Sequence, residues 1–267
     1  MPLRGFVCPL NSGHVDLDTC DKCPSPCLEL PILYALLDKA RTIDKKRFSV
    51  TEILKPPQVL ALERMHDYWT DPLDLVWSTF GTSWHSMIEG QRNRLRVGGF
   101  SLESDNHFEI PFEVDGQTVT IHGTPDQYFW PTETLTDYKT LKYYWDIYYL
   151  QQGKWSDSNY GWQVNMYRRF RFPTCQHMQL VALVKDYNRK LREKCGASPI
   201  VKISVPMIED AKVDEFVRAR LRDHLIAEAD ITKARECTLE ERWKDSLRCF
   251  EYCPCNVHCR QFQERGR

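Results

Sequence analysis

Two short stretches of this chain, His122-Gly123-Thr124-Pro125-Asp126 and Asp137-Tyr138-Lys139, carry its strongest structural signal. The glycine and proline before Asp126 indicate that a strand ends there. Successive side chains of a strand point to opposite faces, so Asp137 and Lys139 share one face of the next strand. Two carboxylates suit Mg²⁺ or Mn²⁺, which prefer oxygen ligands. The pattern therefore predicts a divalent-metal site beside an ammonium group, an arrangement suited to phosphodiester chemistry.

The sequence around these stretches predicts a mixed sheet. Apolar and polar residues alternate in Phe108-Glu109-Ile110-Pro111-Phe112, as is typical of half-buried strands. Asp115-Gly116 is a tight-turn pair that follows this alternating stretch. The expected strands are 108–114, 119–121, 135–141, 177–185 and 201–207.

Helix signals separate these strands. Ser49-Val50-Thr51-Glu52 has the spacing of a helix start, with Ser49 or Thr51 as the cap, and Pro56-Pro57 interrupts that helix. The other expected helices are 28–40, 77–95, 161–172 and 210–234. The inner side of the second of these is expected to hold Trp84, Met87 and Ile88. The expected fold class is therefore α/β, a mixed central β-sheet flanked by helices, with cysteine-rich ends.

The chain has 267 residues, enough for one α/β domain with small appendages. We expect a cysteine-rich metal-binding segment without regular structure over 1–30, a core over 31–235 and a cysteine-rich metal-cluster segment over 236–267. No apolar run approaches membrane-spanning length, and residues 1–10 hold no apolar signal segment. The expectation is a cytoplasmic protein without a membrane partner, in which eleven cysteines favour metal ligation over disulfides.

Charge is unevenly distributed although the formal net charge is only −1. No lysine or arginine lies between Arg96 and Lys139. The acids in that interval are Glu103, Asp105, Glu109, Glu113, Asp115, Asp126, Glu133 and Asp137. The basic clusters elsewhere are Lys45 to Arg47, Arg92 to Arg96, Arg168 to Arg171, and Arg218 to Arg222. An acidic, cation-binding region with basic flanks suits a polyanionic substrate.

Two further pairs of polar residues have helical spacing. His85 and Glu89 are four apart, hence on one face of the 77–95 helix, and Gln163 and Tyr167 are four apart on the 161–172 helix. The ordered set of Gly81-Thr82 with His85 and Glu89, then Gly123-Thr124-Pro125-Asp126, Asp137-Tyr138-Lys139 and Gln163 with Tyr167 resembles the PD-(D/E)XK nuclease superfamily. It is most similar to the RecB-type branch, which includes the CRISPR-adaptation nuclease and many phage exonucleases. The motifs cover residues 49–170.

The resemblance implies a role for each of these residues. The implied metal ligands are His85, Asp126, Asp137 and the backbone carbonyl of Tyr138. The implied catalytic residues are Lys139, together with Gln163 and Tyr167, which contact the substrate phosphate or orient the lysine. Glu89 supports the helix of His85 or a second metal.

The implied activity is Mg²⁺- or Mn²⁺-dependent cleavage of DNA, as an exonuclease on single strands or DNA ends. Such an enzyme serves replication, recombination or defence, with a replication, recombination or helicase partner, in a bacterial, archaeal or phage-infected cell. Aromatic residues between 130 and 162 favour single-stranded DNA, because rings stack on unpaired bases. A different class remains open: a non-catalytic nucleic-acid-binding or assembly protein that kept the fold.

The tail of the chain is rich in thiols. Its cysteines are Cys237, Cys249, Cys253, Cys255 and Cys259. Four thiolates hold either Zn²⁺ or an iron–sulfur cluster. RecB-type nucleases often carry a [4Fe–4S] cluster made from C-terminal cysteines and one N-terminal cysteine, although the spacing in this tail departs from their pattern.

A second thiol set lies at the front of the chain, in Cys8, Cys20, Cys23 and Cys27. Cys20 and Cys23 have the spacing of a metal knuckle, and His14 is a substitute ligand. Two hypotheses stay open: a front zinc site with a separate rear cluster, or one cluster joining Cys27 to three tail cysteines. Cys175 and Cys195 are expected to be ordinary buried thiols.

Overall fold

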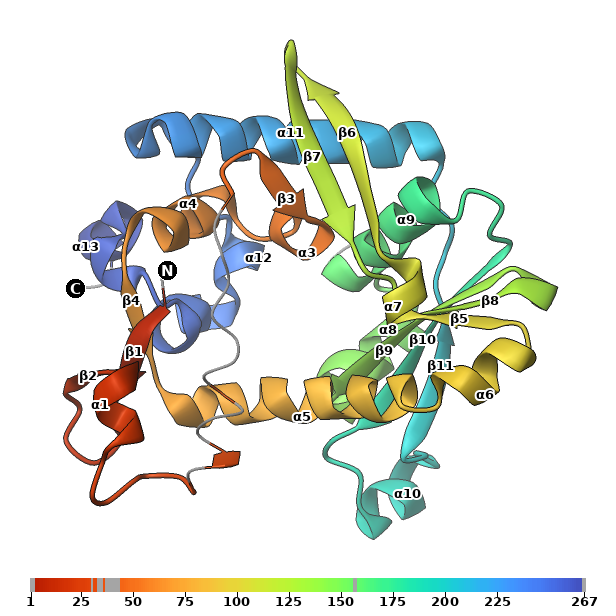
Figure 1. The fold of residues 1–267 in the computed structure, drawn as a ribbon, viewed down its shortest axis with the longest axis horizontal. Coiled ribbons are helices and arrows are strands. Elements are labelled where there is room, and N and C mark those ends of the chain that lie inside the picture. The colour runs from red at the N-terminus through yellow and green to blue at the C-terminus, as the bar shows by residue number, and fades with distance from the viewer. Residues whose placement is uncertain (1–2, 30, 33–35, 37–43, 156–157, 266–267) are drawn as a thin grey trace. The chain divides into compact units, whose positions relative to one another are not determined.

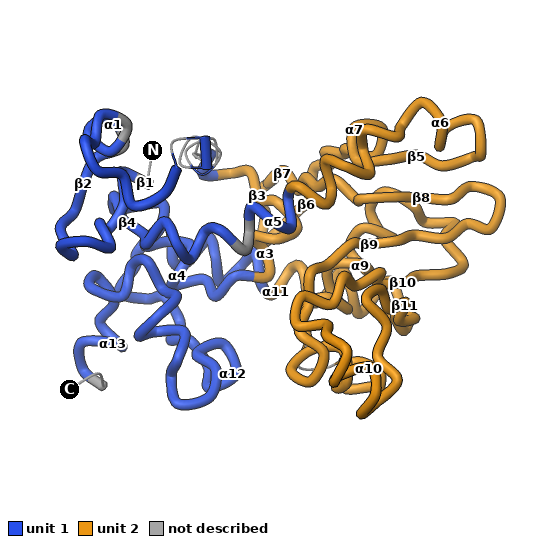
Figure 2. Tube along the Cα trace, turned by 90° about the horizontal axis from the view of Figure 1, so that it is seen from below, with its two compact units in different colours: residues 1–45, 55–82, 220–267 blue, residues 46–54, 83–219 orange. Residues whose placement is uncertain are grey.

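The computed structural model describes residues 3–29, 31–32, 36, 44–155 and 158–265. The chain divides into two compact units (Figure 2). Unit 1 comprises residues 1–45, 55–82 and 220–267, and unit 2 comprises residues 46–54 and 83–219. Both cysteine-rich ends therefore belong to unit 1, while every residue of the expected metal site belongs to unit 2. The three-segment division expected from the sequence stays a prediction.

The main sheet of unit 2 has five strands in the order β11-β10-β9-β8-β5 (Figure 1). Their bounds are β5 Phe100–Leu102, β8 Gln127–Phe129, β9 Thr134–Leu141, β10 His177–Val184 and β11 Ile200–Ser204. Strands β9 and β10 are parallel and the other neighbours are antiparallel, so the sheet is mixed. Leu135 and Leu180 in its two central parallel strands are fully buried.

A second sheet of unit 2 has three strands in the order β3-β7-β6. Its strands are β3 Arg47–Ser49, β6 Phe108–Val114 and β7 Gln117–Gly123. The hairpin between β6 and β7 turns at Asp115 and Gly116, which have φ values of 49° and 79°. Two successive residues with positive φ match the right-handed twist of the paired strands, as the Asp-Gly pair predicts.

Helices flank these sheets, which confirms the expected mixed α/β class. In unit 2 they are α3 Val50–Ile53, α6 Arg92–Val97, α7 Glu103–Asn106, α8 Tyr148–Gln151, α9 Asn159–Arg171 and α10 Arg189–Cys195. Two longer helices run from one unit into the other along the chain: α5 Pro72–Glu89 and α11 Asp210–Ala229. Helix α9 contacts β6 and β9 and buries Val164 and Met166.

Unit 1 contains a three-stranded sheet in the order β2-β1-β4. Its strands and helices are β1 Leu3–Val7, β2 His14–Asp16, β4 Tyr68–Thr70, α1 Leu17–Asp21, α4 Pro57–Met65, α12 Leu239–Arg242 and α13 Arg260–Arg265. The expectation that residues 1–30 lack regular structure was therefore wrong. Strand β1 pairs with β2 and with β4, and the Cys- and Pro-rich composition does not predict this sheet.

Several local predictions are confirmed. Ser49 caps α3 in a capping box with Glu52, and Pro57 begins α4 at the expected interruption. The helix expected over 77–95 instead ends at Glu89 and is followed by α6. Met87 is exposed rather than on the inner side. Most of the helix expected over 28–40 lies outside the described residues.

Cys195 is exposed, which corrects the expectation of a buried thiol, whereas Cys175 is buried as expected. Strands β5 and β8 were not anticipated, because three residues are too few to show an alternating pattern. Among the described helices, none combines the length and the apolar character that crossing a membrane would require.

Candidate metal centre

Asp126 lies in the short connection between β7 and β8 and is buried. Its Oδ2 accepts a hydrogen bond of 2.6 Å from the backbone N–H of Tyr138 in β9. The Tyr138 hydroxyl in turn donates to Gln127 Oε1 at 2.7 Å. These bonds fix the Asp126 carboxylate against the strand that carries Asp137 and Lys139.

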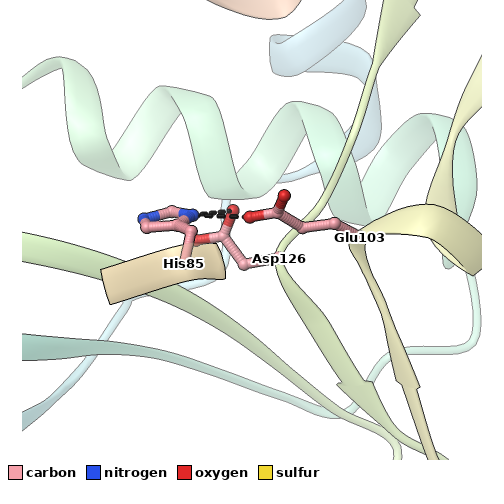
Figure 3. Close-up of side chains that lie close together, drawn as sticks. All are labelled: His85, Glu103 and Asp126. Atoms are coloured by element: carbon pink, nitrogen blue, oxygen red, sulfur yellow. Dashed lines mark hydrogen bonds and ion pairs between the residues drawn. The ribbon is translucent and has the colours of Figure 1, made fainter. Parts of the chain in front are cut away.

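His85, Glu103 and Asp126 bring ligand atoms from three separate segments to within 4.8 Å of one another (Figure 3). His85 Nδ1 lies 2.5 Å from Glu103 Oε1 and 3.4 Å from Asp126 Oδ1. His85 Nε2 lies 3.2 Å from the carbonyl oxygen of Tyr138. Asp137, which the sequence also predicts to be a ligand, is not part of this group, and within the described part of the chain no other three His, Cys, Asp or Glu residues meet this criterion. One imidazole and two carboxylates form a donor set that fits Mg²⁺ or Mn²⁺.

The protein groups around His85 strongly favour its protonated form. Burial alone lowers the pKa of this imidazole, but hydrogen bonds and negative charge from Asp126 and Glu103 raise the pKa to about 10. A proton on His85 therefore offsets part of the negative charge of the two carboxylates, as a bound cation would. Metal binding must displace that proton, because a ligating imidazole is neutral.

Asp137 and Lys139 share one face of β9, as their spacing predicts, and form an ion pair with Lys139 Nζ 2.7 Å from Asp137 Oδ2. The Asp137 residue is only 1% exposed, and its Oδ1 has no hydrogen-bond partner among the described residues. Burial raises the pKa of Asp137 to about 6, although the Lys139 charge opposes the rise. A buried carboxylate oxygen without a partner is costly unless a ligand satisfies it.

The pKa of Lys139 is raised although burial lowers it, because the charges of Asp137 and Asp126 outweigh desolvation. The amine is therefore an ammonium group at neutral pH in this environment. It can stabilise negative charge on a phosphate, but it cannot accept a proton in that form.

Gln163 and Tyr167 on α9 are both buried, and Gln163 Nε2 donates to the Tyr167 hydroxyl at 3.2 Å. Burial raises the pKa of Tyr167, and the negative charge of Asp137 adds to the rise. On the same helix, the Tyr160 ring lies 5.8 Å from Lys139 Nζ. The structure therefore places this face of α9 close to the Asp137–Lys139 pair.

Gly123 allows α9 to approach the end of β7. A Cβ atom at Gly123 would lie 2.8 Å from Tyr167 Cε1 and 2.9 Å from Phe108 Cε1. We expect Gly123→Ala to lower the free energy of unfolding by about 1–3 kcal/mol, as overpacking does, and to displace the Tyr167 ring. Urea unfolding measures the loss. Gly161→Ala is the control, because its nearest contact would be 3.5 Å from a Trp155 ring carbon and its stability should not fall.

Glu103 was not identified as a ligand from the sequence. It begins α7, directly after β5, and it lies within the acidic interval that holds no lysine or arginine. Glu89, the acid singled out instead, accepts a hydrogen bond from the Ser104 hydroxyl. Its other oxygen is buried without a partner among the described residues. The four-residue spacing of Glu89 from His85 can be recognised in the sequence, whereas the proximity of Glu103 to His85 depends on how the strands pair.

All four basic clusters expected to contact a polyanion are partly engaged within the protein. Their ion pairs are Arg47 with Glu109, Arg92 and Arg96 with Asp105, Arg168 with Asp210, Arg169 with Asp214, and Arg220 with Glu241. The charge of these arginines is therefore offset by acids of the protein itself, which reduces what the clusters can offer to a nucleic acid.

The two thiol sets lie in unit 1. Cys8, Cys20, Cys23 and Cys27 line one cavity of about 430 Å³. In the tail, Cys255 and Cys259 pack with Leu62 in a buried cluster. Burial raises the pKa of Cys237 to about 12 and that of Cys253 to about 11. These thiols are protonated at neutral pH, so any metal they bind must displace protons.

No known protein-family profile matches the chain, and no curated protein matches its sequence. A solved structure does match: the crystal structure of SSO0001 aligns with a TM-score of 0.56 at 13% identity. The alignment covers 86% of this chain and 94% of SSO0001. At this identity the likeness is one of fold.

Proposed function

We propose that this protein is a Mg²⁺- or Mn²⁺-dependent DNA nuclease of the RecB-type PD-(D/E)XK branch. The observation that supports the proposal most directly is the cluster of His85, Glu103 and Asp126 in the same unit as the buried Asp137–Lys139 pair. The substrate we propose is single-stranded DNA or a DNA end, cleaved as by an exonuclease. Replication, recombination or defence, a helicase-type partner and a cytoplasmic location are parts of the same proposal.

The residues divide into ligands and substrate-binding groups. His85, Glu103, Asp126, Asp137 and the Tyr138 carbonyl would hold the ion, which supplies Lewis-acid polarisation of the phosphate and lowers the pKa of a bound water. The Lys139 ammonium group would stabilise the negative charge that develops on the phosphate. Gln163 and Tyr167 would orient that phosphate, or Lys139, through their paired amide and hydroxyl groups.

Glu103 is expected to matter more than Glu89 for metal binding. Glu103→Gln removes one of the two charges that face His85, so Mn²⁺ affinity should fall at least about tenfold. The pKa of His85 should fall as well, because one of its two carboxylate partners is lost. Glu89→Gln is the matched control, since its amide can still accept from Ser104. Calorimetric Mn²⁺ titration compares the two, and an equal loss in both would contradict the assignment of Glu103 as a ligand.

The function itself is tested by incubating end-labelled single- and double-stranded DNA with the full chain and Mn²⁺. We expect shortened products that disappear with EDTA and with Asp126→Ala. Retarded bands without shortened products would instead support the second candidate, a nucleic-acid-binding or assembly protein that kept the nuclease fold. If neither shortened products nor retarded bands are seen, nucleic acid is not the substrate.

The cysteines are proposed to bind metal for structural reasons, because each thiol set contributes to a small buried cluster among the described residues of unit 1. For the tail set we propose a [4Fe–4S] cluster or Zn²⁺, and for the front set we propose Zn²⁺. Anaerobic protein should contain iron and sulfide, and absorb near ~400 nm, if the tail holds a cluster. It should contain only zinc and be colourless if both sets hold zinc. Protein that binds neither metal would show that the thiols serve packing alone.

A further inference from the structure

The four side chains of helix α7 make contacts with α5, with α6 and with the segment that precedes Asp126. Glu103 faces His85, and the Ser104 hydroxyl donates to Glu89 on the same helix as His85. Asp105 accepts from the guanidinium groups of Arg92 and Arg96 on α6. The last residue, Asn106, contacts the segment that carries Asp126.

Asn106 has no exposed surface, and its contacts connect two of the segments that form the site. Its Nδ2 donates to the Pro125 carbonyl at 3.0 Å and to the Ser101 carbonyl at 3.2 Å. Pro125 immediately precedes Asp126, so this bond orients the peptide group next to the ligand. The Asn106 Oδ1 is buried without a partner among the described residues, which makes the side chain costly unless its amide group is needed.

The backbone of α7 is held from a third direction. Arg171, at the end of α9, donates from Nε to the Asn106 carbonyl and from Nη2 to the Asp105 carbonyl, both at 3.2 Å. Helix α9 also carries Gln163 and Tyr167. One turn of helix thus joins the segments that bear His85, Asp126 and the α9 pair.

We propose that Asn106 is a positioning residue of the metal centre. By tying the Pro125 carbonyl to α7, it sets the separation between the Asp126 carboxylate and the Glu103–His85 pair. Groups that orient metal ligands in this way are worth about 10- to 100-fold in metal affinity. The effect on cleavage rests on the proposed function, whereas the effect on metal binding does not.

The chain offers a matched control in Asn165, which is also fully buried. Its Nδ2 donates to the Gly161 carbonyl at 2.9 Å and to the Pro206 carbonyl at 3.0 Å, and its Oδ1 accepts from Ile208 at 2.8 Å. Its amide nitrogen thus makes the same kinds of bond as that of Asn106, but to segments that hold no proposed metal ligand, and its Oδ1 is satisfied whereas that of Asn106 is not. Leucine is the replacement at both positions, because it is close in size and adds no charge that would itself attract a cation.

The test measures Mn²⁺ affinity of the full chain by electron paramagnetic resonance, at a temperature where circular dichroism shows each variant folded. Asn106→Leu should weaken binding about 10- to 100-fold, and raising the Mn²⁺ concentration should restore any cleavage activity. Asn165→Leu should lower the unfolding temperature without a resolvable change in Mn²⁺ affinity.

Unchanged affinity in Asn106→Leu, equal losses in both variants, or a wild-type chain that binds no Mn²⁺ would each overturn the proposal. A chain that binds Mn²⁺ and loses affinity with Asn106→Leu, yet cleaves no DNA, would contradict only the proposed function. A chain that cleaves DNA while Asn106→Leu binds normally would contradict only the positioning role.

Discussion

Replacing Lys139 with methionine is expected to lower the rate of DNA cleavage by about 10²- to 10³-fold, the loss seen when one preorganised electrostatic group is removed from an active site. The reason is the location of the ammonium group, 2.7 Å from Asp137 Oδ2 on a strand face that is largely shielded from water. Charge in such a place acts far more strongly on a developing negative charge than it would in solvent. Rates are measured on labelled DNA at saturating Mn²⁺.

The same variant should change stability only modestly. Removing one partner of a buried ion pair costs about 3–5 kcal/mol when the other charge stays buried. Asp137 avoids most of this cost, because its pKa is about 6 even beside Lys139 and rises further once the cation is gone. The carboxyl group can then take up a proton near neutral pH. Loss of cleavage should therefore occur in a folded protein, as circular dichroism and thermal unfolding can show.

Lys142 provides the matched control for this prediction. It follows β9 directly, is exposed, and lies only three residues beyond Lys139. Lys142→Met removes the same charge from the same sequence region, so it should leave the cleavage rate unchanged. If the Lys139→Met protein cleaves at the wild-type rate, Lys139 has no part in the mechanism and the RecB-type assignment is wrong.

The parts of the fold that were foreseen are those with local causes. The β6–β7 hairpin follows from alternation and an Asp-Gly turn, and α3 follows from the Ser49–Glu52 capping box. Asp137 and Lys139 were assigned to one face of a strand because side-chain direction alternates along any strand. Such signals involve residues close in sequence, and tertiary context did not override them here.

The features that the sequence does not predict depend on pairing between segments that are far apart in the chain. Strand β5 has only three residues and exists because it pairs with β8, which is also three residues long. That pairing brings Glu103, the residue after β5, to the histidine of α5. The acidic interval marked the region correctly, but no spacing rule distinguished Glu103 from its acidic neighbours.

The basic clusters likewise show that the sequence alone does not tell which charges are available to a substrate. Arg92 and Arg96 look like part of a surface for a polyanion until their common partner, Asp105, is known. Arg169 is likewise paired, with Asp214 on α11. A run of arginines in a sequence gives the number of charges, whereas their availability to a substrate depends on acids elsewhere in the fold.

Metal affinity is expected to rise steeply with pH, and this is the second large effect. His85 has a pKa of about 10, so at any pH below that value the metal must displace a proton from it. The apparent dissociation constant for Mn²⁺ should then fall about tenfold for each pH unit between 6.5 and 8. Below pH 6 the slope should steepen, because Asp137, with a pKa of about 6, must also lose a proton.

Stability without added metal should have the opposite dependence on pH. Both pKa values are raised above those of the unfolded chain, so the folded state binds more protons. The contribution of His85 is complete below pH 6.5 and is lost as the pH rises through 10, and that of Asp137 is complete below 3.8 and is lost through 6. In EDTA the unfolding temperature should therefore fall with pH above neutrality, while the stabilisation by Mn²⁺ grows. His85→Gln should flatten the affinity profile, since no imidazole proton remains to be displaced, and a flat profile in the wild-type chain would show that His85 is not a ligand.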